Sequence, residues 1–531
     1  MMGLLDHLPA MPVLLPSLTA IVLLLVGDHG GSEHNTRRLL LSSRISIISA
    51  LIGLVIAIEL IVRASGGDLM VYRMGEWPAP FGIVLVVDRL SAMMVLLTSL
   101  VALPVLLYAS GGWAGHGRYF HALFQFQLMG LNGAFVTGDL FNLFVFFEVL
   151  LIASYVLMMH GLGRERLRVG VHYVVLNLSA SALFLIGVAL LYALTGTLNM
   201  ADLALRVPLV TGPDAVVLQV AALVLLVVFG FKAALAPLSV WLPATYSAAS
   251  APVAALFAIM TKVGVYAIWR VHGVMFGAGA GASANLVEPL LLPLAVATSV
   301  IGVLGALAAP TLSRLVAWLT VASVGTILMA VGLFGEAAWS AALYYMAHST
   351  LTVAGLFLLV ELVAAQRGEV GGRIEPASAV AQPTMLGLML LLAAASSIGL
   401  PPLPGFIGKL MLLQASSGHA QVVVVWTVVL LVGFASLLGL ARAGSTLFWH
   451  VRTDLPSGAS GASAPLVVAT SMLLAASVAM SVFAAPLQRY TQATAAQLTD
   501  TRAYFEAVLG EQGGAAARPT RPYTGRSGGT P

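Results

Sequence analysis

The chain has 531 residues, of which 60% are hydrophobic and only 9% are charged, and its mean hydropathy is +0.99. Soluble domains carry about 25% charged residues, so this composition excludes a soluble core and indicates a polytopic membrane protein. Cysteine is absent, which excludes disulfides and cysteine-held metal clusters, and the net charge of +4 comes without the basic, aromatic-rich stripe of a nucleic-acid binder. No nucleotide-binding loop is present either, so we expect no cofactor and no nucleic-acid partner.

About fourteen apolar runs follow one another, each near the roughly 20 residues that a membrane-spanning helix needs. The predicted fold class is therefore all-α. The expected spans are 9–27, 39–62, 91–110, 120–137, 140–159, 170–195, 215–236, 252–272, 288–309, 314–334, 337–363, 384–417 (interrupted), 420–449 and 464–486. No basic segment precedes the first run, so we read it as a retained span. After about residue 490 the chain turns polar and rich in Gly and Pro, which predicts a disordered tail.

Arginine is distributed unevenly over the loops between these spans. One set of loops carries Arg37, Arg38, Arg118, Arg164, Arg166, Arg168, Arg314, Arg367, Arg373 and Arg452. The other set carries Arg63, Arg73, Arg89, Arg206 and Arg270. Because basic loops stay in the cytoplasm, the richer set predicts the cytoplasmic side of a bacterial inner membrane and places both termini on the outer side.

Two spans are interrupted by prolines in the same style. The seventh runs into Pro237 and Pro243, and the twelfth is broken by Pro401, Pro402 and Pro404. Broken helices at membrane depth are tolerated where protein or a watery cavity satisfies the freed backbone groups, and paired breaks are typical of internal repeats around a transport path. The expected organisation is 1–110 (helices 1–3), 111–272 (first five-helix repeat), 273–450 (second five-helix repeat), 451–490 (helix 14) and 491–531 (tail).

Only three lysines occur in the chain, and all three lie inside apolar runs: Lys232, Lys262 and Lys409. A charged side chain at the centre of a membrane costs about 2.5–3.5 kcal/mol on insertion scales, so it is normally kept for a function. A desolvated ammonium can release its proton near neutral pH, whereas a guanidinium stays charged. Proton transfer is thus one reading; snorkelling of Lys262 and capping of loose carbonyls by Lys232 and Lys409 are the structural alternatives.

Two further ionisable groups lie near the middle of spans. Glu148, in the fifth span, must be protonated, paired or exposed to water, and a packing role for a protonated carboxyl is the alternative to ion translocation. His348, in the eleventh span, suits a proton relay, although a buried histidine is often a neutral core residue. Asp139, just before the fifth span, reads as a helix N-cap, and Glu361 as an interfacial residue near a span end.

Three stretches carry a family resemblance: TGDLFNLFVFFEVLLIASYVL (137–157), GFKAALAPLSVWLPATYSAASAPVAALFAIMTKVGVY (230–266) and SIGLPPLPGFIGKL (397–410). They resemble the antiporter-like membrane subunits of respiratory complex I. The amino-acid sequence of the first stretch is similar to that of the D-type subunit of the multisubunit Mrp-type (Pha/Mnh) Na⁺(K⁺)/H⁺ antiporters. The similarity extends over about residues 80–450.

The resemblance implies roles for five residues. Glu148 matches the family's essential glutamate, Lys232 its paired lysine, Lys262 the central lysine, His348 the relay histidine and Lys409 the terminal lysine. It implies a proton-translocating subunit of a monovalent cation (Na⁺ or K⁺)/proton antiporter, not an enzyme, in which a Glu148–Lys232 ion pair gates proton movement. A proton-pumping subunit of complex I or of a membrane-bound hydrogenase is the alternative, and a non-transporting scaffold is a third.

Many relatives place a further lysine one turn after the histidine, where this chain has Thr352 and Val353, so the relay is expected to use water and hydroxyls such as Ser349 and Thr350. The resemblance also implies partners: other antiporter subunits, especially the large A-type subunit and the small membrane subunits. No second cluster of Asp, Asn and Ser is evident as an oxygen cage for a hard cation, so the chain alone is expected to perform no exchange.

Overall fold

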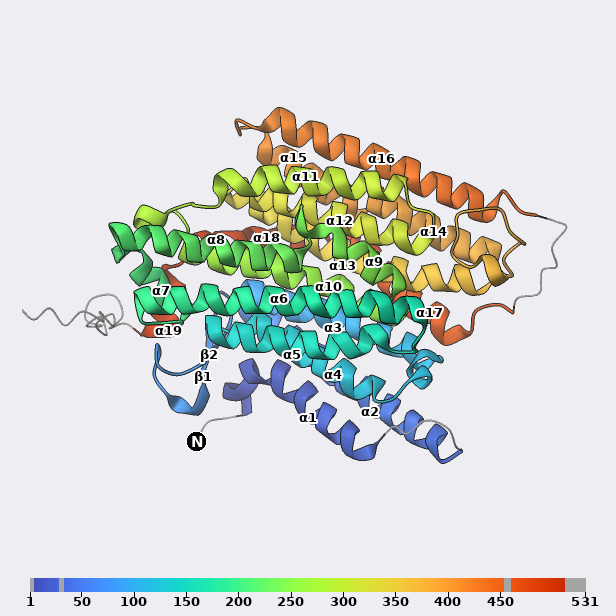
Figure 1. Ribbon diagram of the computed structural model, residues 1–531, viewed down its shortest axis with the longest axis horizontal. Coiled ribbons are helices and arrows are strands. Elements are labelled where there is room, and N and C mark those ends of the chain that lie inside the picture. The colour runs from blue at the N-terminus through green and yellow to red at the C-terminus, as the bar shows by residue number, and fades with distance from the viewer. Residues whose placement is uncertain (1–3, 28–32, 453–459, 511–531) are drawn as a thin grey trace, which may run out of the picture.

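The computed structural model describes residues 4–27, 33–452 and 460–510 as a bundle of long, roughly parallel helices (Figure 1). The helices run horizontally in Figure 1, with α1 and α2 at the bottom and α16 at the top. A two-stranded sheet and the short helices α7 and α19 lie at the left end of the bundle. The all-α expectation is confirmed.

The α-helices are, in chain order, α1 (Met11–Val26), α2 (Glu33–Ser65), α3 (Arg89–Ser110), α4 (Phe120–Val136), α5 (Leu140–Met159), α6 (Arg164–Thr195), α7 (Met200–Arg206), α8 (Pro213–Ala233), α9 (Trp241–Ala248), α10 (Ala251–Ile268), α11 (Glu288–Leu307), α12 (Leu312–Val331), α13 (Glu336–Ala365), α14 (Pro383–Ile398), α15 (Pro404–Ser416), α16 (Val422–Phe448), α17 (Ala464–Val482), α18 (Ala484–Thr499) and α19 (Arg502–Leu509). A π-helical turn, Trp269–Met275, continues α10.

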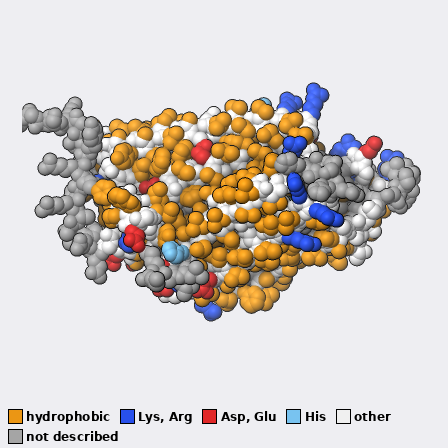
Figure 2. All heavy atoms as spheres, turned by 90° about the horizontal axis from the view of Figure 1, so that it is seen from below, with side chains coloured by type: hydrophobic (Ala, Val, Ile, Leu, Met, Phe, Trp, Pro, Cys, Tyr) orange, Lys and Arg blue, Asp and Glu red, His pale blue; other side chains and the backbone are white. Residues whose placement is uncertain are grey.

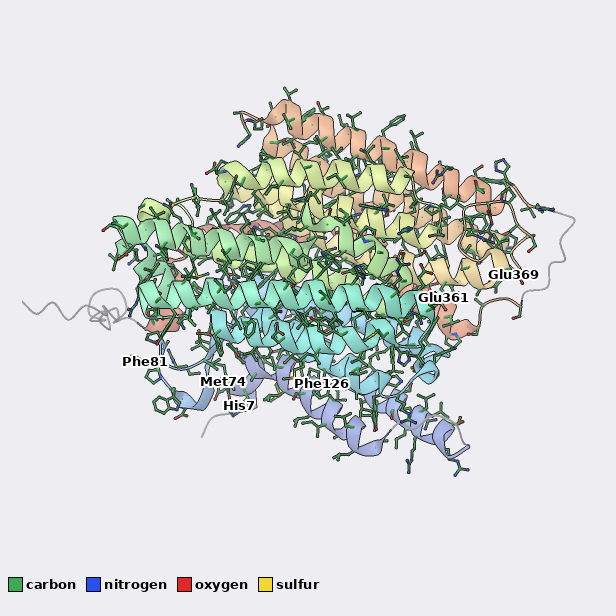
Figure 3. All side chains as sticks on the ribbon, viewed as in Figure 1. His7, Met74, Phe81, Phe126, Glu361 and Glu369 are labelled. Atoms are coloured by element: carbon green, nitrogen blue, oxygen red, sulfur yellow. The ribbon has the colours of Figure 1, made fainter. Side chains whose placement is uncertain are left out.

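Among the described residues, twelve helical segments are long and apolar enough to cross a membrane, and α14 is a shorter apolar helix. The chain is therefore a multi-pass membrane protein, while the count of fourteen spans stays a prediction. Figure 2 shows an apolar band across one face of the bundle, with most of the visible Lys and Arg side chains gathered at one end of it. Glu361 and Glu369 lie at the opposite end of the bundle from Phe81 (Figure 3).

The helices differ in how deeply they are buried. Every residue of α10 is buried, and α12 and α13 are buried along most of their length. The peripheral helices α2, α6 and α16 instead expose apolar side chains such as Val55, Ile186 and Leu431. In a membrane protein such exposed faces contact lipid, so the centre of the bundle is the place where polar groups need protein partners.

Both expected helix breaks are present. α8 ends at Ala233, and the residues after it turn through Pro237 before α9 begins. The freed backbone groups find partners in the protein, because the Ala236 amide donates to Thr298 Oγ1 at 2.8 Å and Trp241 Nε1 donates to the Phe231 carbonyl at 3.0 Å. The twelfth span divides into α14 and α15 around the proline cluster.

The tail prediction was partly wrong. Residues 484–509 form α18 and α19, and buried residues such as Leu498 and Tyr504 attach these helices to the bundle. Their alanines and threonines pack closely although their hydropathy is low, which is why an apolar-run criterion overlooked them. Residues 511–531 lie outside the described residues.

The hairpin of β1 (Met70–Arg73) and β2 (Val84–Val87) was also not expected. Its strands pair antiparallel, with Met70 opposite Val87. Directly after it, Asp88 caps α3 and forms a buried ion pair with Arg270, at 2.6 Å. The Arg270 guanidinium also lies over the ring of Tyr504 from α19, 5.8 Å from the ring centroid, so the C-terminal helices cover this buried charge pair.

Candidate functional site

Glu148 and Lys232 are both held by α6. Ser181 donates a short hydrogen bond to Glu148 Oε1, and Lys232 Nζ donates to Asn177 Oδ1 at 2.8 Å. Asn177 and Ser181 are four residues apart and therefore lie one turn apart on the same face of the helix. The direct ion pair that the resemblance implied is not formed: within the described part of the chain, no salt bridge joins Glu148 to Lys232. The reason is geometric, because α6 packs against both α5 and α8 and offers each group a neutral partner.

Aromatic rings close off the other side of Lys232. Its ammonium lies over the Phe147 ring, 5.9 Å from the centroid, which is the geometry of a cation–π contact. Phe147 packs edge-on against Phe184, and Phe184 against Phe229, at centroid distances of 5.7 and 5.2 Å. The Lys232 ammonium thus lies beside aromatic rings and has one hydrogen-bond acceptor, the amide oxygen of Asn177.

Lys262 is fully buried on α10. Its Nζ donates to Thr261 Oγ1 at 3.2 Å, a single weak partner for an ammonium that carries three hydrogens. Gly264 lets α10 approach α8 closely: a Cβ there would lie 2.5 Å from the Ala233 amide nitrogen and 2.7 Å from the Phe229 carbonyl oxygen. Ala233 directly follows Lys232. The close contact therefore packs α10, which carries Lys262, against the end of α8, which carries Lys232.

Lys409 lies at the second helix break. Its Nζ donates to the Ile398 carbonyl at 2.6 Å and to the Ser397 carbonyl at 3.4 Å. These carbonyls belong to the last turn of α14, where helix acceptors have no partner within the helix. The capping contact expected as the structural alternative for Lys409 is therefore present, whereas Lys232 binds a side-chain amide instead of the carbonyls at its own break.

His348 and Lys409 line the same cavity. The volume of this cavity that the centres of water molecules can occupy is about 30 Å³. The cavity is also lined by the hydroxyl-bearing residues Ser323, Thr326, Ser349, Thr352 and Ser436. A water needs about 10–15 Å³ on this measure and two to four polar partners, so the space suits water. The structure therefore brings together the two relay candidates that lie on different helices, α13 and α15.

Hydroxyls extend this polar region beyond the histidine. Thr352 Oγ1 lies 3.2 Å from His348 Nδ1, and Ser477 Oγ on α17 lies 2.8 Å from Thr352 Oγ1. Both hydroxyls expected to assist, those of Ser349 and Thr350, donate to the Met346 carbonyl on their own helix, and of the two it is Ser349 that lines the cavity. Thr352, the residue in the position where relatives carry a lysine, is the one that contacts the histidine.

The remaining expectations concern the ends of spans. Asp139 is the N-cap of α5, because its carboxylate accepts a hydrogen bond from the Asn142 amide at 2.8 Å. Glu361 accepts a hydrogen bond from Trp113 Nε1 near the end of α13. Sequence reasoning missed Asn177, Ser181 and Ser477 and named Thr352 only as the position where relatives carry a lysine. Such neutral side chains occur in many membrane helices, and only their positions in the folded bundle distinguish them.

Comparison with known proteins identifies the class to which this architecture belongs. Residues 137–439 match the family described as "NADH:quinone oxidoreductase/Mrp antiporter, TM", and this range includes all five candidate residues. The chain belongs to this family of antiporter-like membrane subunits.

Individual relatives cover nearly the whole chain. A protein of Rhizobium meliloti, named as the D-type subunit of a probable K⁺/H⁺ antiporter, is 41% identical over 95% of this chain and 98% of its own length. The D-type subunit of a Na⁺/H⁺ antiporter from Alkalihalophilus pseudofirmus is 36% identical over 95% of this chain and its full length. Among solved structures, a chain of the Mrp complex from Dietzia sp. DQ12-45-1b superposes with a TM-score of 0.85 at 28% identity, covering 96% of this chain and 100% of that one.

A chain of respiratory complex I from Thermus thermophilus superposes with a TM-score of 0.76 at 23% identity, over 92% of this chain and 99% of that one. At this identity the likeness shows a shared fold alone.

Proposed function

We propose that this chain is a proton-translocating subunit of a multisubunit monovalent cation/proton antiporter. The observation that carries the proposal is the water-sized polar cavity shared by His348 and Lys409, which gives two titratable groups on separate helices a common medium. Relatives named as K⁺/H⁺ and Na⁺/H⁺ antiporter subunits favour antiport over redox-driven pumping. The cation is Na⁺ or K⁺.

The five groups act in sequence along the bundle. Protons reach Lys262 through a half-channel near α10, move laterally through water to His348 and Lys409, and leave by the second break.

Glu148 controls this movement through Lys232. When Glu148 neutralises Lys232, Lys262 keeps its proton more easily. When Glu148 and Lys232 separate, the uncompensated charge of Lys232 repels the proton on Lys262. Two unit charges about 10 Å apart at an effective dielectric constant of about 20 repel by roughly 1.7 kcal/mol, which shifts an equilibrium more than tenfold.

This role makes the chain a secondary transporter subunit that breaks no covalent bond, with the transmembrane proton gradient as its energy source. Its partners are the other antiporter subunits, including the large A-type subunit and the small membrane subunits. The arginine-rich end faces the cytoplasm of a bacterial cell, and both termini lie outside.

The test is antiport by everted vesicles from cells that express the complete set of subunits. Glu148→Gln and Lys232→Ala should each abolish cation-dependent proton movement, because each removes one charge of the coupled pair. Glu59→Gln is the matched control: Glu59 also lies in a span, but it is paired with Arg63 at the exposed face of α2, at 2.7 Å. Antiport near the wild-type rate in either site variant, at equal expression and assembly, would refute the gating role.

Purification in mild detergent tests the rival function. Co-purification of the chain with antiporter subunits alone is the expected result. Recovery with redox subunits that carry flavin, nickel or iron–sulfur centres would assign the chain to a respiratory or hydrogenase complex instead.

A further inference from the structure

A second polar cavity lies outside the lysine region, among the first four helices. It measures about 20 Å³ for the centres of water molecules. Its polar lining comes from three helices: Ser49 on α2, Thr98 and Ser99 on α3, and Gln125 and Asn132 on α4. Pro12 and Pro16 of α1 complete the wall, and no Asp, Glu, Lys, Arg or His is among the residues that line it.

The side-chain amide oxygens of Gln125 and Asn132 have no hydrogen-bond partner in the protein. Gln125 is fully buried, and Asn132 is 8% exposed. Gln125 Oε1 and Asn132 Oδ1 are buried atoms without a hydrogen-bond partner in the structure. Leaving a buried acceptor without a partner is costly, so two such oxygens at one cavity point to a ligand that supplies positive charge or hydrogens.

A backbone carbonyl fixes the orientation of each amide, because it can accept a hydrogen bond from the amide nitrogen but cannot donate one to the amide oxygen. Gln125 Nε2 donates to the carbonyl of Ser46 at 3.2 Å and to its hydroxyl at 2.9 Å. Asn132 Nδ2 donates to the carbonyl of Pro12 at 2.9 Å. Pro16 has no amide hydrogen, so the Pro12 carbonyl one turn earlier lacks its helical partner and needs this bond. Reversing either amide would place an oxygen against a carbonyl oxygen.

The hydroxyl hydrogens of the lining are also committed elsewhere. Thr98 donates to the Met94 carbonyl at 2.8 Å, and Ser99 to the Val95 carbonyl at 3.0 Å. The hydroxyl hydrogen of Thr19 goes to the Leu15 carbonyl at 2.7 Å, so in the 2.8 Å contact between Thr19 and Ser49 the serine is the donor.

The lining residues therefore carry five acceptor oxygens, from the three hydroxyls and two amides, and the one uncommitted donor among them is the second hydrogen of Asn132 Nδ2. A single water could donate to two of these oxygens and accept the second hydrogen of Asn132 Nδ2, but the other three oxygens would gain no donor from it. A cation needs no donor and is attracted by every acceptor oxygen that faces it. Hard cations prefer oxygen ligands, and rings of neutral oxygens are known to replace the hydration shell of K⁺.

We infer that this cavity is a binding site for one dehydrated monovalent alkali cation, Na⁺ or K⁺. The inference rests on the proposed antiport function and assigns the cation a site within this chain. The absence of a carboxylate from the lining favours a single charge, because the desolvation cost of an ion rises with the square of its charge and neutral oxygens compensate a divalent ion poorly.

A row of buried serines on α2 runs from the cavity toward the end of the helix that carries Arg37 and Arg38. Ser42, Ser43, Ser46 and Ser49 are all buried and recur at helical spacing, and the row begins one to two turns after Arg37 and Arg38. Beyond the cavity, the buried residues on this helix are Ala57, Leu60 and Ala64. On α2 the buried polar residues thus lie on the arginine-bearing side of the cavity, which favours exchange of the cation with that side.

The sequence analysis identified no second cluster of Asp, Asn and Ser that could act as an oxygen cage. The ligands proposed here are neutral side chains of α2, α3 and α4, so no single stretch of sequence contains them together.

The test is cation binding to the purified complex in nanodiscs. Bound ²²Na⁺ and ⁸⁶Rb⁺ (for K⁺) are counted at equilibrium for the wild type and for the double variant Gln125→Met/Asn132→Leu. We expect the variant to bind one cation fewer per complex, or the same cation at least tenfold more weakly. In a second measurement, Na⁺ or K⁺ should raise the Tm of the wild type relative to choline at equal ionic strength, and the variant should lose this shift.

Gln127→Met is the matched control, because Gln127 is a fully buried glutamine with two unpartnered amide atoms on the same helix but does not line the cavity. It should keep wild-type cation binding. Equal binding by the wild type and the double variant, or no cation-specific Tm shift in the wild type, would overturn the inference and leave a water-filled cavity; displacement by Mg²⁺ at equal concentration would overturn the assignment to a monovalent ion.

Glu148→Gln separates this inference from the proposed function. This variant should bind the cation normally although it cannot transport. Loss of antiport in Glu148→Gln together with unchanged binding in the cavity variant would overturn only the cation site, whereas full antiport in Glu148→Gln would overturn only the proton gate.

Discussion

Asn177 provides a direct test of the arrangement around Lys232. Its Oδ1 is the hydrogen-bond acceptor of Lys232 Nζ, at 2.8 Å, in an environment otherwise formed largely by aromatic rings. A hydrogen bond to a charged group contributes about 1.5–3 kcal/mol, so Asn177→Leu should destabilise the charged lysine by that amount. Since about 1.4 kcal/mol corresponds to a factor of ten, the equilibrium between the two protonation states of Lys232 should change by roughly 10- to 150-fold.

We expect Asn177→Leu to reduce antiport in everted vesicles at least tenfold, with assembly of the complex preserved. Ser179→Ala is the control on the same helix: the Ser179 hydroxyl donates to the Val175 carbonyl, 3.0 Å away, on an exposed face. It should retain the wild-type rate. A rate for Asn177→Leu within twofold of the wild type would show that the amide does not set the charge state of Lys232, and the proposed role of α6 would be lost.

Lys262→Arg keeps a positive charge that cannot be released near neutral pH, so antiport should fall as far as in Lys262→Ala, and rescue by arginine would disprove the relay. Thr352→Val should lower the antiport rate several-fold without changing the Tm, whereas Thr350→Val, which loses only an intrahelical bond, should not. Asp88→Asn should cost about 3–5 kcal/mol of stability, because it leaves Arg270 buried without its counter-charge. Burial alone would raise the pKa of Asp88, but the Arg270 charge and hydrogen bonds outweigh it and lower that pKa. The wild type should therefore keep this stability above the ordinary carboxyl pKa and lose it as the pH falls through the lowered one, and a Tm–pH profile of the Asn variant should lack that acid loss.

The sequence predicted long apolar helices well because hydropathy alone defines them. The fifth span was predicted at its observed limits, since Asp139 caps one end and the apolar run stops at the other. The sixth begins earlier than expected, at Arg164, because its charged first turns favour helix without being apolar. α18 was missed for the related reason that small polar residues can pack closely without raising hydropathy. Whether the two five-helix units are repeats stays a prediction.

The candidate site followed the same logic. Glu148, Lys262 and their companions were recognisable because a charge inside an apolar run is costly and therefore conspicuous. Their neutral partners were not, because a serine or asparagine in a membrane helix has no such cost when its own helix offers a carbonyl. Only the packing of α6 between α5 and α8 distinguishes Asn177 from the other amides of the chain.

This packing bears on how a gate between Glu148 and Lys232 can have two states. In the present arrangement each charged group has a neutral partner, and the two partners lie on successive turns of α6. Moving Glu148 and Lys232 together into a direct ion pair would add one attraction between opposite charges, and it would weaken these hydrogen bonds as far as the side chains leave Ser181 and Asn177. Each bond contributes about 1.5–3 kcal/mol, and a charge pair at close range contributes a few kcal/mol at the effective dielectric constant of a protein interior. These opposing terms are of similar size, so neither arrangement is strongly favoured. A gate needs that balance, because a proton arriving nearby can then reverse the preference.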